Sequence, residues 1–342
     1  MEKSSVLVTG GAGYIGSHVV RQLVERGERV VVLDNLSTGY RSAVLGAPLV
    51  VGDTADRSLV ANVLAEHRID AVLHFAAHTV VPESVANPLK YYGNNTCATR
   101  NLLEQCDRAE VRRFVFSSTA AVYGMPAEGL AREDSATVPI NPYGTSKLMS
   151  EWMLRDLAAG SPRLRYVALR YFNVAGSDPG GRIGHSAPDA TLLVKVACQV
   201  AAGVKPELHI FGTDYPTPDG TGVRDYIHVE DLAAAHLKAL DYLEHGGAST
   251  TLNCGYGHGY SVREVIRTVE QVHGRPIKVV ESARRPGDPP SLVACADRIR
   301  EILDWTPRFD NLETIVRSQL EWEFRLKREP ALLQNEPAVR RA

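Results

Sequence analysis

A short apolar stretch followed by a glycine-rich loop lies near the start of the chain and restricts the folds it can adopt. Residues 5–9, Ser-Val-Leu-Val-Thr, are rich in β-branched residues, which predicts a buried strand. The loop at 10–16, Gly-Gly-Ala-Gly-Tyr-Ile-Gly, comes next. An amphipathic segment then runs to Arg26, and Gly27 is placed to end it. We therefore predict a strand, a glycine loop and a helix.

The loop glycines fit two known spacings, G-x-x-G-x-x-G at Gly10, Gly13 and Gly16, or G-x-G-x-x-G at Gly11, Gly13 and Gly16. In either spacing, the missing Cβ atoms let backbone N–H groups approach a pyrophosphate at the positive end of a helix. A second strand at 29–33 ends in Asp34, about 20 residues after the loop, where an acid accepts hydrogen bonds from a ribose diol. Because a carboxylate would repel a 2′-phosphate, the sequence favours NAD over NADP.

The strand-and-helix pattern repeats along the first half of the chain. Further strands are expected at 49–52, 71–75, 113–117 and 166–171, with helices at 94–105 and 143–159. This alternation predicts a parallel sheet with helices on both faces, whose ligands bind at the carboxyl ends of the strands. Five residues of ligand-binding type fall at those ends: Asp34, Asp53, Phe75, Ser117 and Thr119. There Asp53 could reach an adenine amino group, and the small Ala76 and Ala77 would let a cofactor lie over the strand.

The second half of the chain is less regular. A stretch rich in glycine, proline and polar residues follows Asn173, and short strands and helices follow it. We expect an α/β fold: a Rossmann-type doubly wound parallel sheet at 1–175, with a returning segment at about 223–250, and a smaller, interleaved α/β substrate-binding lobe at 176–222 and 251–325. The end, 328–342, is expected to be a loose tail.

Tyr143 and Lys147 are four residues apart on a predicted helix, so their side chains share a face roughly 6 Å from each other. A lysine ammonium favours the phenolate form of a neighbouring tyrosine. Lowering a phenol pKa from about 10 to 7 takes about 4 kcal/mol of preferential stabilisation. A lysine alone could not supply this in water, so a cofactor cation and a dry pocket are needed as well. The hydroxyl of Thr119 could then share a substrate hydroxyl with the phenol.

Composition excludes several classes of protein. A net charge of −2 gives no strong attraction to nucleic acid or to membranes, and no apolar run is long enough to span a bilayer. The N-terminus leaves no room for a signal peptide before the first strand. The five cysteines are scattered, and the eleven histidines show no ligand spacing, which predicts reduced thiols in a cytoplasmic protein and no metal site.

Arginines in turn-rich segments of the second half suggest a phosphate clamp. Guanidinium groups grip phosphate bidentately. Arg224, Arg284 and Arg285 are the candidates, with Asp288 as an acidic partner. The rings of Phe211, Tyr226 and Tyr256 could stack on a base. These features predict a second ligand that bears a nucleotide, opposite the dinucleotide-binding lobe.

Several segments of the chain together carry a family resemblance. They are Val-Thr-Gly-Gly-Ala-Gly-Tyr-Ile-Gly-Ser-His (8–18), Leu-Asp-Asn-Leu (33–36), His-Phe-Ala-Ala (74–77), Tyr-Tyr-Gly-Asn-Asn (91–95), Phe-Ser-Ser-Thr-Ala-Ala-Val-Tyr-Gly (116–124), Pro-Tyr-Gly-Thr-Ser-Lys (142–147) and Leu-Arg-Tyr-Phe-Asn-Val-Ala-Gly (169–176). The most specific segments are 210–229 and Arg-Arg-Pro-Gly-Asp (284–288). On these segments, from about residue 5 to 325, the chain resembles the UDP-glucose (galactose) 4-epimerases of the extended short-chain dehydrogenase/reductase superfamily.

The resemblance implies a role for each matching residue. Tyr143 would be the acid/base, Lys147 its electrostatic partner and Thr119 the hydroxyl shared with the sugar 4-OH. Residues implied to hold NAD are Gly10, Gly13, Tyr14, Ile15, Gly16, Asp34, Asn35, Asp53, Thr54, Phe75, Ala76, Ala77, Asn94, Ser117, Tyr143, Lys147 and Tyr171. Residues implied to hold the UDP-sugar are Thr119, Tyr143, Asn173, Leu192, Phe211, Arg224, Tyr226, Arg285, Asp288 and Leu292.

The implied reaction interconverts UDP-glucose and UDP-galactose by removing hydride from sugar C4, turning the 4-keto sugar over and returning hydride to its other face. Two positions depart from the family. Thr79 replaces a frequent lysine near the nicotinamide ribose, which predicts weaker NAD retention. Leu292 replaces a bulky tyrosine beside the sugar 2-substituent, so by volume an N-acetyl group could fit.

Other activities and the assembly stay open from the sequence. A 4-epimerase of UDP-glucuronate or UDP-pentoses would differ only in pocket polarity. A 4,6-dehydratase would need an Asp-Glu pair after Thr119, where Ala120 and Ala121 stand. A non-catalytic nucleotide sensor on this fold would have lost the Tyr, Lys and hydroxyl set, which is intact. The family implies a homodimer, and the helix at 143–159 agrees because its apolar residues cover more than one stripe: Leu148, Met149, Trp152, Met153 and Leu157.

Overall fold

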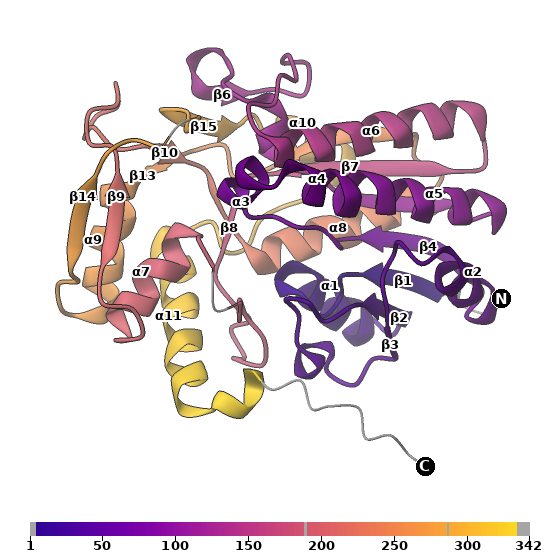
Figure 1. Ribbon diagram of the computed structural model, residues 1–342, viewed down its shortest axis with the longest axis horizontal. Coiled ribbons are helices and arrows are strands. Elements are labelled where there is room, and N and C mark those ends of the chain that lie inside the picture. The colour runs from indigo at the N-terminus through magenta and orange to yellow at the C-terminus, as the bar shows by residue number, and fades with distance from the viewer. Residues whose placement is uncertain (1–4, 188–189, 286, 334–342) are drawn as a thin grey trace.

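In the residues described by the computed structural model, 5–187, 190–285 and 287–333, a seven-stranded parallel sheet forms the centre of the first lobe (Figure 1). The strand order is β12-β7-β5-β4-β1-β2-β3. The chain therefore winds outward from β1 and then returns to β4 on the other side of β1, which makes a switch point at their carboxyl ends. The strands are β1 (Ser5–Thr9), β2 (Arg29–Asp34), β3 (Leu49–Val51), β4 (Ile69–His74), β5 (Arg113–Ser117), β7 (Arg165–Tyr171) and β12 (Thr250–Cys254).

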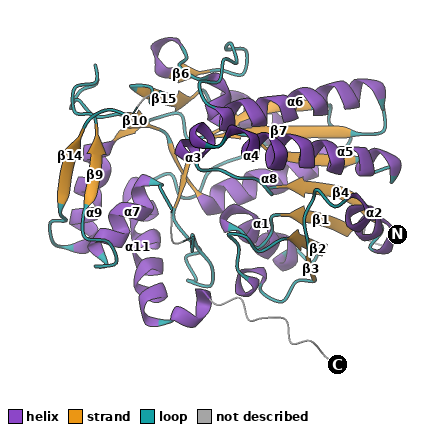
Figure 2. Ribbon diagram, viewed as in Figure 1, coloured by secondary structure: helices purple, strands orange, loops and turns teal. Residues whose placement is uncertain are grey.

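Helices cover both faces of this sheet (Figure 2), which confirms the predicted doubly wound fold. The side chains of β1 alternate between two cores: Val6 and Val8 join one cluster, and Leu7 joins the other. The first cluster holds apolar residues of α1 (Tyr14–Glu25) and α8 (Val229–Glu244), and the second holds those of α2 (Arg57–Glu66), α5 (Ala98–Arg108) and α6 (Pro142–Gly160). Burial on both faces explains why these strands read as unbroken apolar runs.

Several short helical segments lie between or after the main elements, and most of them were not predicted. They are η1 (Arg41–Val44), α3 (Val81–Ala86), α4 (Pro88–Tyr91), the π-helical turn η2 (Tyr92–Cys97), η3 (Ala120–Tyr123), η4 (Ala127–Gly129) and η5 (Pro330–Leu333).

The second lobe combines small sheets with helices and lies beside the carboxyl ends of the first sheet (Figure 1). One sheet has the order β13-β10-β15-β6, and the pairs β11-β8 and β14-β9 stand apart from it. The strands are β6 (Leu130–Ala131), β8 (Asn173–Ala175), β9 (Leu208–Phe211), β10 (Val223–Arg224), β11 (Tyr226–His228), β13 (Tyr260–Ser261), β14 (Val279–Ser282) and β15 (Ser291–Ala294). The helices are α7 (Leu193–Ala201), α9 (Val262–His273), α10 (Asp297–Leu303) and α11 (Leu312–Arg328).

The expected lobe boundaries need several corrections, among them β6, β8 and β11, which fall in the ranges expected for the first lobe but belong to the small sheets of the second. Residues 251–254 belong to the first lobe, because β12 continues to Cys254 as an edge strand beside β7. Residues 223–224 belong to the second, because β10 pairs with β13 and β15. The described start of the expected tail is ordered, since Arg328 ends α11 and Leu332 accepts a hydrogen bond from Ser42; residues 334–342 lie outside the described part.

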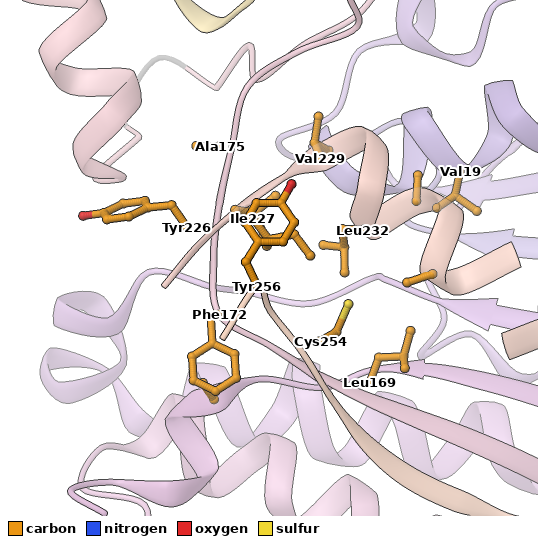
Figure 3. Close-up of a cluster of buried hydrophobic side chains, with 14 of the residues drawn as sticks. Val19, Leu169, Phe172, Ala175, Tyr226, Ile227, Val229, Leu232, Cys254 and Tyr256 are labelled. Atoms are coloured by element: carbon orange, nitrogen blue, oxygen red, sulfur yellow. The ribbon is translucent and has the colours of Figure 1, made fainter. Parts of the chain in front are cut away.

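The lobes are joined by a continuous apolar cluster beneath the crossing strands (Figure 3). Tyr256 lies inside this cluster near Ile227 and Leu232, and its hydroxyl donates to the carboxylate of Asp231 at 2.6 Å. The prediction that Tyr256 could stack on a base is therefore wrong, because packing and this hydrogen bond hold the ring in the core. Tyr226 points away from its neighbour Ile227 in Figure 3, as alternation along β11 requires.

Membrane-spanning helices and the state of the cysteines were both addressed by the sequence. No helix among them is both long and apolar enough to cross a membrane. The five cysteines are all described and are all free thiols, of which Cys106, Cys198 and Cys254 are buried.

Candidate active site

The glycine loop forms a close-packed turn between β1 and α1. Gly10 has φ +72°, and a Cβ there would lie 2.6 Å from the backbone nitrogen of Ala76, so the segment after β4 and the loop approach each other more closely than a side chain allows. A Cβ on Gly16 would collide with the backbone of Gly10. Gly13 is the N-cap of α1 and contributes no side chain, which leaves the first turn, from Tyr14 and Ile15 on, open to an anionic ligand.

Asp34 lies at the carboxyl end of β2, beside this turn. Its two carboxylate oxygens accept hydrogen bonds from the backbone nitrogens of Ala12 (2.9 Å) and Leu36 (2.8 Å). These bonds fix the carboxylate, and its further lone pairs remain available to hydroxyl donors. Burial raises the pKa of this carboxyl, while both backbone bonds lower it.

Other predicted cofactor residues gather along the same strand ends. Asn35 donates to the carboxylate of Asp53 at 2.8 Å, and Thr54 is buried beside them. Phe75 lies against His236, with their ring centroids 4.7 Å apart, and the half-buried Ala76 and Ala77 follow it. Asn94 lies in the π-helical turn η2 and donates to the Asn95 side chain at 3.0 Å.

The sequence reasoning missed Asn95 itself. This residue is 1% exposed, and its side chain bonds both the N–H (2.8 Å) and the carbonyl (3.0 Å) of His78. It also donates to the hydroxyl of Ser146 at 3.1 Å. Asn95 thus joins the segment after β4 to α6. The π-helical turn that aims it had no signal in the residue pattern.

Helix α6 carries the predicted acid/base pair. It begins where expected, because the Asn141 side chain accepts a hydrogen bond from the Gly144 nitrogen at 2.9 Å, and Pro142 occupies the first turn. Tyr143 is 7% exposed and Lys147 is 2% exposed, one turn apart on one face. Lys147 donates to the backbone carbonyl of Ser117 at 2.9 Å, and its Nζ lies 4.9 Å from the centroid of the Phe116 ring.

Thr119 comes just after β5 and faces the phenol of Tyr143. Burial raises the pKa of Tyr143, and a hydrogen bond with the Thr119 side chain lowers it. Burial also lowers the pKa of Lys147 to about 7, which the Coulomb attraction of Glu151 opposes. In the protein alone, both pKa shifts work against an acidic phenol. The raised pKa of Tyr143 makes the phenol harder to ionise, and the lowered pKa of Lys147 weakens the positive charge beside it. This agrees with the expectation that lysine alone cannot activate the tyrosine.

Two further predicted cofactor residues contact each other. The hydroxyls of Ser117 and Tyr171 are 2.6 Å apart. Tyr14, by contrast, donates its hydroxyl to the Gly176 carbonyl at 2.6 Å and stacks on His185, with ring centroids 4.5 Å apart. The side chain of Tyr14 therefore ties α1 to the second lobe, and a contact with the cofactor would come from its backbone.

The arginines of the expected phosphate clamp divide into two kinds. The guanidinium carbon of Arg285 lies 3.7 Å from the centroid of the Phe211 ring, and the Asp288 side chain is exposed nearby in sequence. Arg284 instead pairs with the carboxylate of Asp214 at 2.6 Å and lies over the ring of Tyr215. Arg284 is thus held by its own lobe, whereas the Arg285 side chain makes no hydrogen bond or ion pair with the described residues, so its N–H donors can bind an anion.

The chain is similar to known proteins over most of its length. The model of the NAD-dependent epimerase/dehydratase family matches residues 6–255. A UDP-glucose 4-epimerase of Azospirillum brasilense is 59% identical over 323 residues, which cover 94% of this chain and 92% of that protein. The chain belongs to the NAD-dependent epimerase/dehydratase family.

Solved structures of the family have the same fold. A UDP-glucose 4-epimerase from Brucella ovis in complex with NAD superposes with a TM-score of 0.91 at 43% identity, covering 94% of this chain and 98% of that one. A UDP-Glc/GlcNAc 4-epimerase from Campylobacter jejuni has a TM-score of 0.83 at 47% identity, covering 94% and 99%. NAD is the cofactor of the family, and the glycine turn, the open start of α1 and Asp34 fit a dinucleotide.

The remaining predicted substrate residues lie in the second lobe. Asn173 pairs with Tyr226 between β8 and β11, Leu192 is the N-cap of α7, and Arg224 pairs with Leu292 between β10 and β15. Leu292 is 9% exposed and belongs to the larger core cluster. Its place beside the sugar stays a prediction. Among the described residues no cluster of side chains could hold a metal ion.

Proposed function

We propose that this protein interconverts UDP-glucose and UDP-galactose by transient oxidation at sugar C4, with NAD bound in the first lobe. The observation that carries the proposal is the meeting of Tyr143, Lys147 and the Thr119 side chain at the carboxyl end of β5. The glycine turn lies on the same edge of the sheet, two strands away at β1. The high identity to UDP-glucose 4-epimerases supports the same reaction.

Tyr143 holds and moves the proton of the sugar 4-hydroxyl. Its phenolate accepts this proton as the C4–H bond breaks, and the phenol returns it when the alcohol re-forms. Thr119 shares the same hydroxyl and orients it. NAD, held by the glycine turn and Asp34, would supply the acceptor for the C4 hydride and the donor for its return to either face of the ring.

Lys147 stabilises the phenolate through its charge. The hydrogen bond to Ser117 fixes the ammonium, so the charge needs no rearrangement as the proton moves. Burial of Tyr143 excludes water, which strengthens both interactions.

The second lobe holds the nucleotide end of the substrate. Arg285 and Arg224 supply phosphate donors, and Phe211, Asn173, Leu192 and Tyr226 form the surroundings of the base and ribose, with Asp288 on a ribose hydroxyl. A firm hold on UDP leaves the sugar free to present either face to Tyr143. This division of labour is required for a reversible inversion at one carbon.

The assembly we propose is a cytoplasmic homodimer in which α6 packs against its copy. On this helix Met149 is 37% exposed and Trp152 is 46% exposed, and packing against a second copy would cover both apolar side chains. The exposed side chains of Val85 and Leu89 come from α3 and α4, which contact α6.

The test is an assay of purified protein with UDP-galactose and no added NAD, with products resolved by NMR. The expected product is UDP-glucose, formed at a rate that added NAD increases if Thr79 weakens retention of the cofactor. Absence of UDP-glucose with and without added NAD would refute the proposal.

A further inference from the structure

Glu151 is a buried carboxylate that the proposed mechanism leaves unused. It follows Tyr143 and Lys147 at the same four-residue spacing on α6, so all three side chains lie along one helix face. Glu151 is 5% exposed, within a protein whose acidic residues are mostly at the surface. A buried charge at this position calls for a physical account.

These three side chains reach three consecutive residues at the end of β5. Lys147 bonds the carbonyl of Ser117, and Tyr143 faces the hydroxyl of Thr119. Between them, the hydroxyl of Ser118 donates to the Glu151 carboxylate at 2.5 Å. A helix and a strand end are thus matched residue for residue, and two of the three contacts belong to the acid/base machinery.

The Glu151 carboxylate is itself held rigidly. Arg170 on β7 binds it through two nitrogens, at 3.0 and 2.6 Å, and is only 7% exposed. Arg170 also donates to the hydroxyl of Tyr123 at 2.9 Å, and that hydroxyl donates to the Asn253 side chain at 2.6 Å. Bidentate geometry between a guanidinium and a carboxylate fixes direction as well as distance.

The same chain of hydrogen bonds ends in the second lobe. The Asn253 amide nitrogen donates to the carbonyl of Ala131 in β6 at 2.9 Å and to that of Cys295, which follows β15, at 3.4 Å. The end of β5 is therefore tied through buried polar groups to the sheet that carries Arg224 and Leu292.

We propose that Glu151 is a positioning residue, whose carboxylate holds Ser118 and thereby sets the main chain that presents the Ser117 carbonyl to Lys147 and the Thr119 hydroxyl to the substrate. This inference rests on the proposed epimerase function and adds a residue to it. Glu151 also favours the charged form of Lys147 by Coulomb attraction, so the positioning role is tested at Ser118, whose hydroxyl bonds the carboxylate.

The competing explanation is that Glu151 and Arg170 form a buried ion pair that merely holds β7 to α6. The two explanations differ in the importance of the Ser118 hydroxyl. An ion pair made for stability does not need Ser118, because Arg170 already satisfies both carboxylate oxygens. A positioning role requires it.

Ser118→Ala is the deciding variant, since it removes one hydroxyl and leaves the ion pair intact. We expect kcat for UDP-galactose to fall about 10- to 100-fold, because small misplacements of catalytic groups cost that much. The KM is expected to stay within about threefold, because the UDP contacts are untouched. Ser318→Ala removes a buried hydroxyl in α11 that donates to the Ile315 carbonyl and accepts from the Ser177 nitrogen, and it serves as the control that keeps full turnover.

A double-mutant cycle tests whether Glu151 acts through Ser118. If it does, the combined variant S118A/E151Q loses little more turnover than the more damaged single variant, within about threefold, because coupled residues are not additive. Melting temperatures of all variants separate loss of fold from loss of turnover. Glu151→Gln can destabilise the protein, and in that event S118A alone decides.

A kcat of S118A within about twofold of the unaltered protein overturns the inference, as do fully additive losses in the cycle. The unaltered protein is assayed in parallel. If it does not epimerise UDP-galactose, the proposed function fails and this inference falls with it; if it is active while S118A is undamaged, only the positioning role fails.

Discussion

The ammonium of Lys147 donates to the main-chain carbonyl of Ser117 across 2.9 Å, so the direct partner of this buried cation is a neutral dipole. A dipole offsets less of the cost of burying a charge than a carboxylate would. Burial accordingly lowers the pKa of Lys147 to about 7, against an ordinary value of 10.5. The site is built to hold a cation that the protein alone accommodates poorly.

The first prediction concerns stability between pH 7 and 9 and uses protein from which NAD has been removed. The folded state releases the Lys147 proton near pH 7, whereas the unfolded chain keeps it to about pH 10.5. Because the unfolded chain binds more protons in this window, stability should rise with pH by about 2 kcal/mol between pH 7 and 9 from this group. Lys147→Met should lack that rise and lack turnover.

Urea unfolding of both proteins across this pH range measures the difference in their free energies of unfolding. The free energy of unfolding of the unaltered protein should increase relative to that of Lys147→Met as the pH rises. A constant difference would mean that Lys147 stays protonated in the folded protein, and the lowered pKa assigned to it would then be wrong.

The second prediction is that Tyr143→Phe lowers kcat by about 100-fold or more, since general acid–base catalysis contributes at least that much. Binding of NAD and of UDP should be nearly unchanged, because only one hydroxyl is lost. The control is Tyr166→Phe, another buried tyrosine, 8% exposed, near the opposite end of β7 from the site. Retention of more than about a tenth of the activity in Tyr143→Phe would place the base elsewhere.

Much of this site followed from the sequence because its signals are local. The glycine loop, Asp34 and the Tyr143–Lys147 spacing each depend on neighbours in the chain, and the parallel sheet required only strand and helix periods. The observed seven-stranded parallel sheet confirms the fold predicted from those signals. The same local reasoning placed β1 and β5 at their observed bounds.

The features that were missed depend on pairing between distant segments. β12 joins the first sheet only because Thr250 to Cys254 pair with β7, a relation no single stretch encodes. Tyr256 looked available for stacking until the partner of its hydroxyl, Asp231, was known. Asn95 and Ser118 are ordinary polar residues in the sequence, and only the fold brings His78 and Glu151 to them.

The third prediction separates two adjacent arginines. Arg285→Lys should raise the KM for UDP-galactose about 10-fold or more while kcat changes little, because a lysine loses bidentate phosphate binding and stacking on Phe211. Arg284→Lys should change the KM by less than about threefold, since Arg284 is engaged by Asp214. Steady-state kinetics measure both. Equal effects of the two changes would contradict this assignment.

The last prediction concerns the sugar that the site accepts. Leu292 replaces a bulky aromatic residue in the expected position beside the sugar 2-substituent, and Arg224, a proposed phosphate ligand, pairs with it across β10 and β15. We expect the protein to convert UDP-N-acetylglucosamine at millimolar concentration, as well as UDP-glucose. Leu292→Tyr should reduce that conversion about 10-fold or more while UDP-galactose turnover falls by less than about threefold, because the added ring fills the space of the acetyl group. NMR of product mixtures measures both reactions in the same sample. Failure of the unaltered protein to convert the N-acetyl sugar would exclude the wider specificity, whereas equal loss of both activities in Leu292→Tyr would show that residue 292 acts through the core cluster in which it is buried.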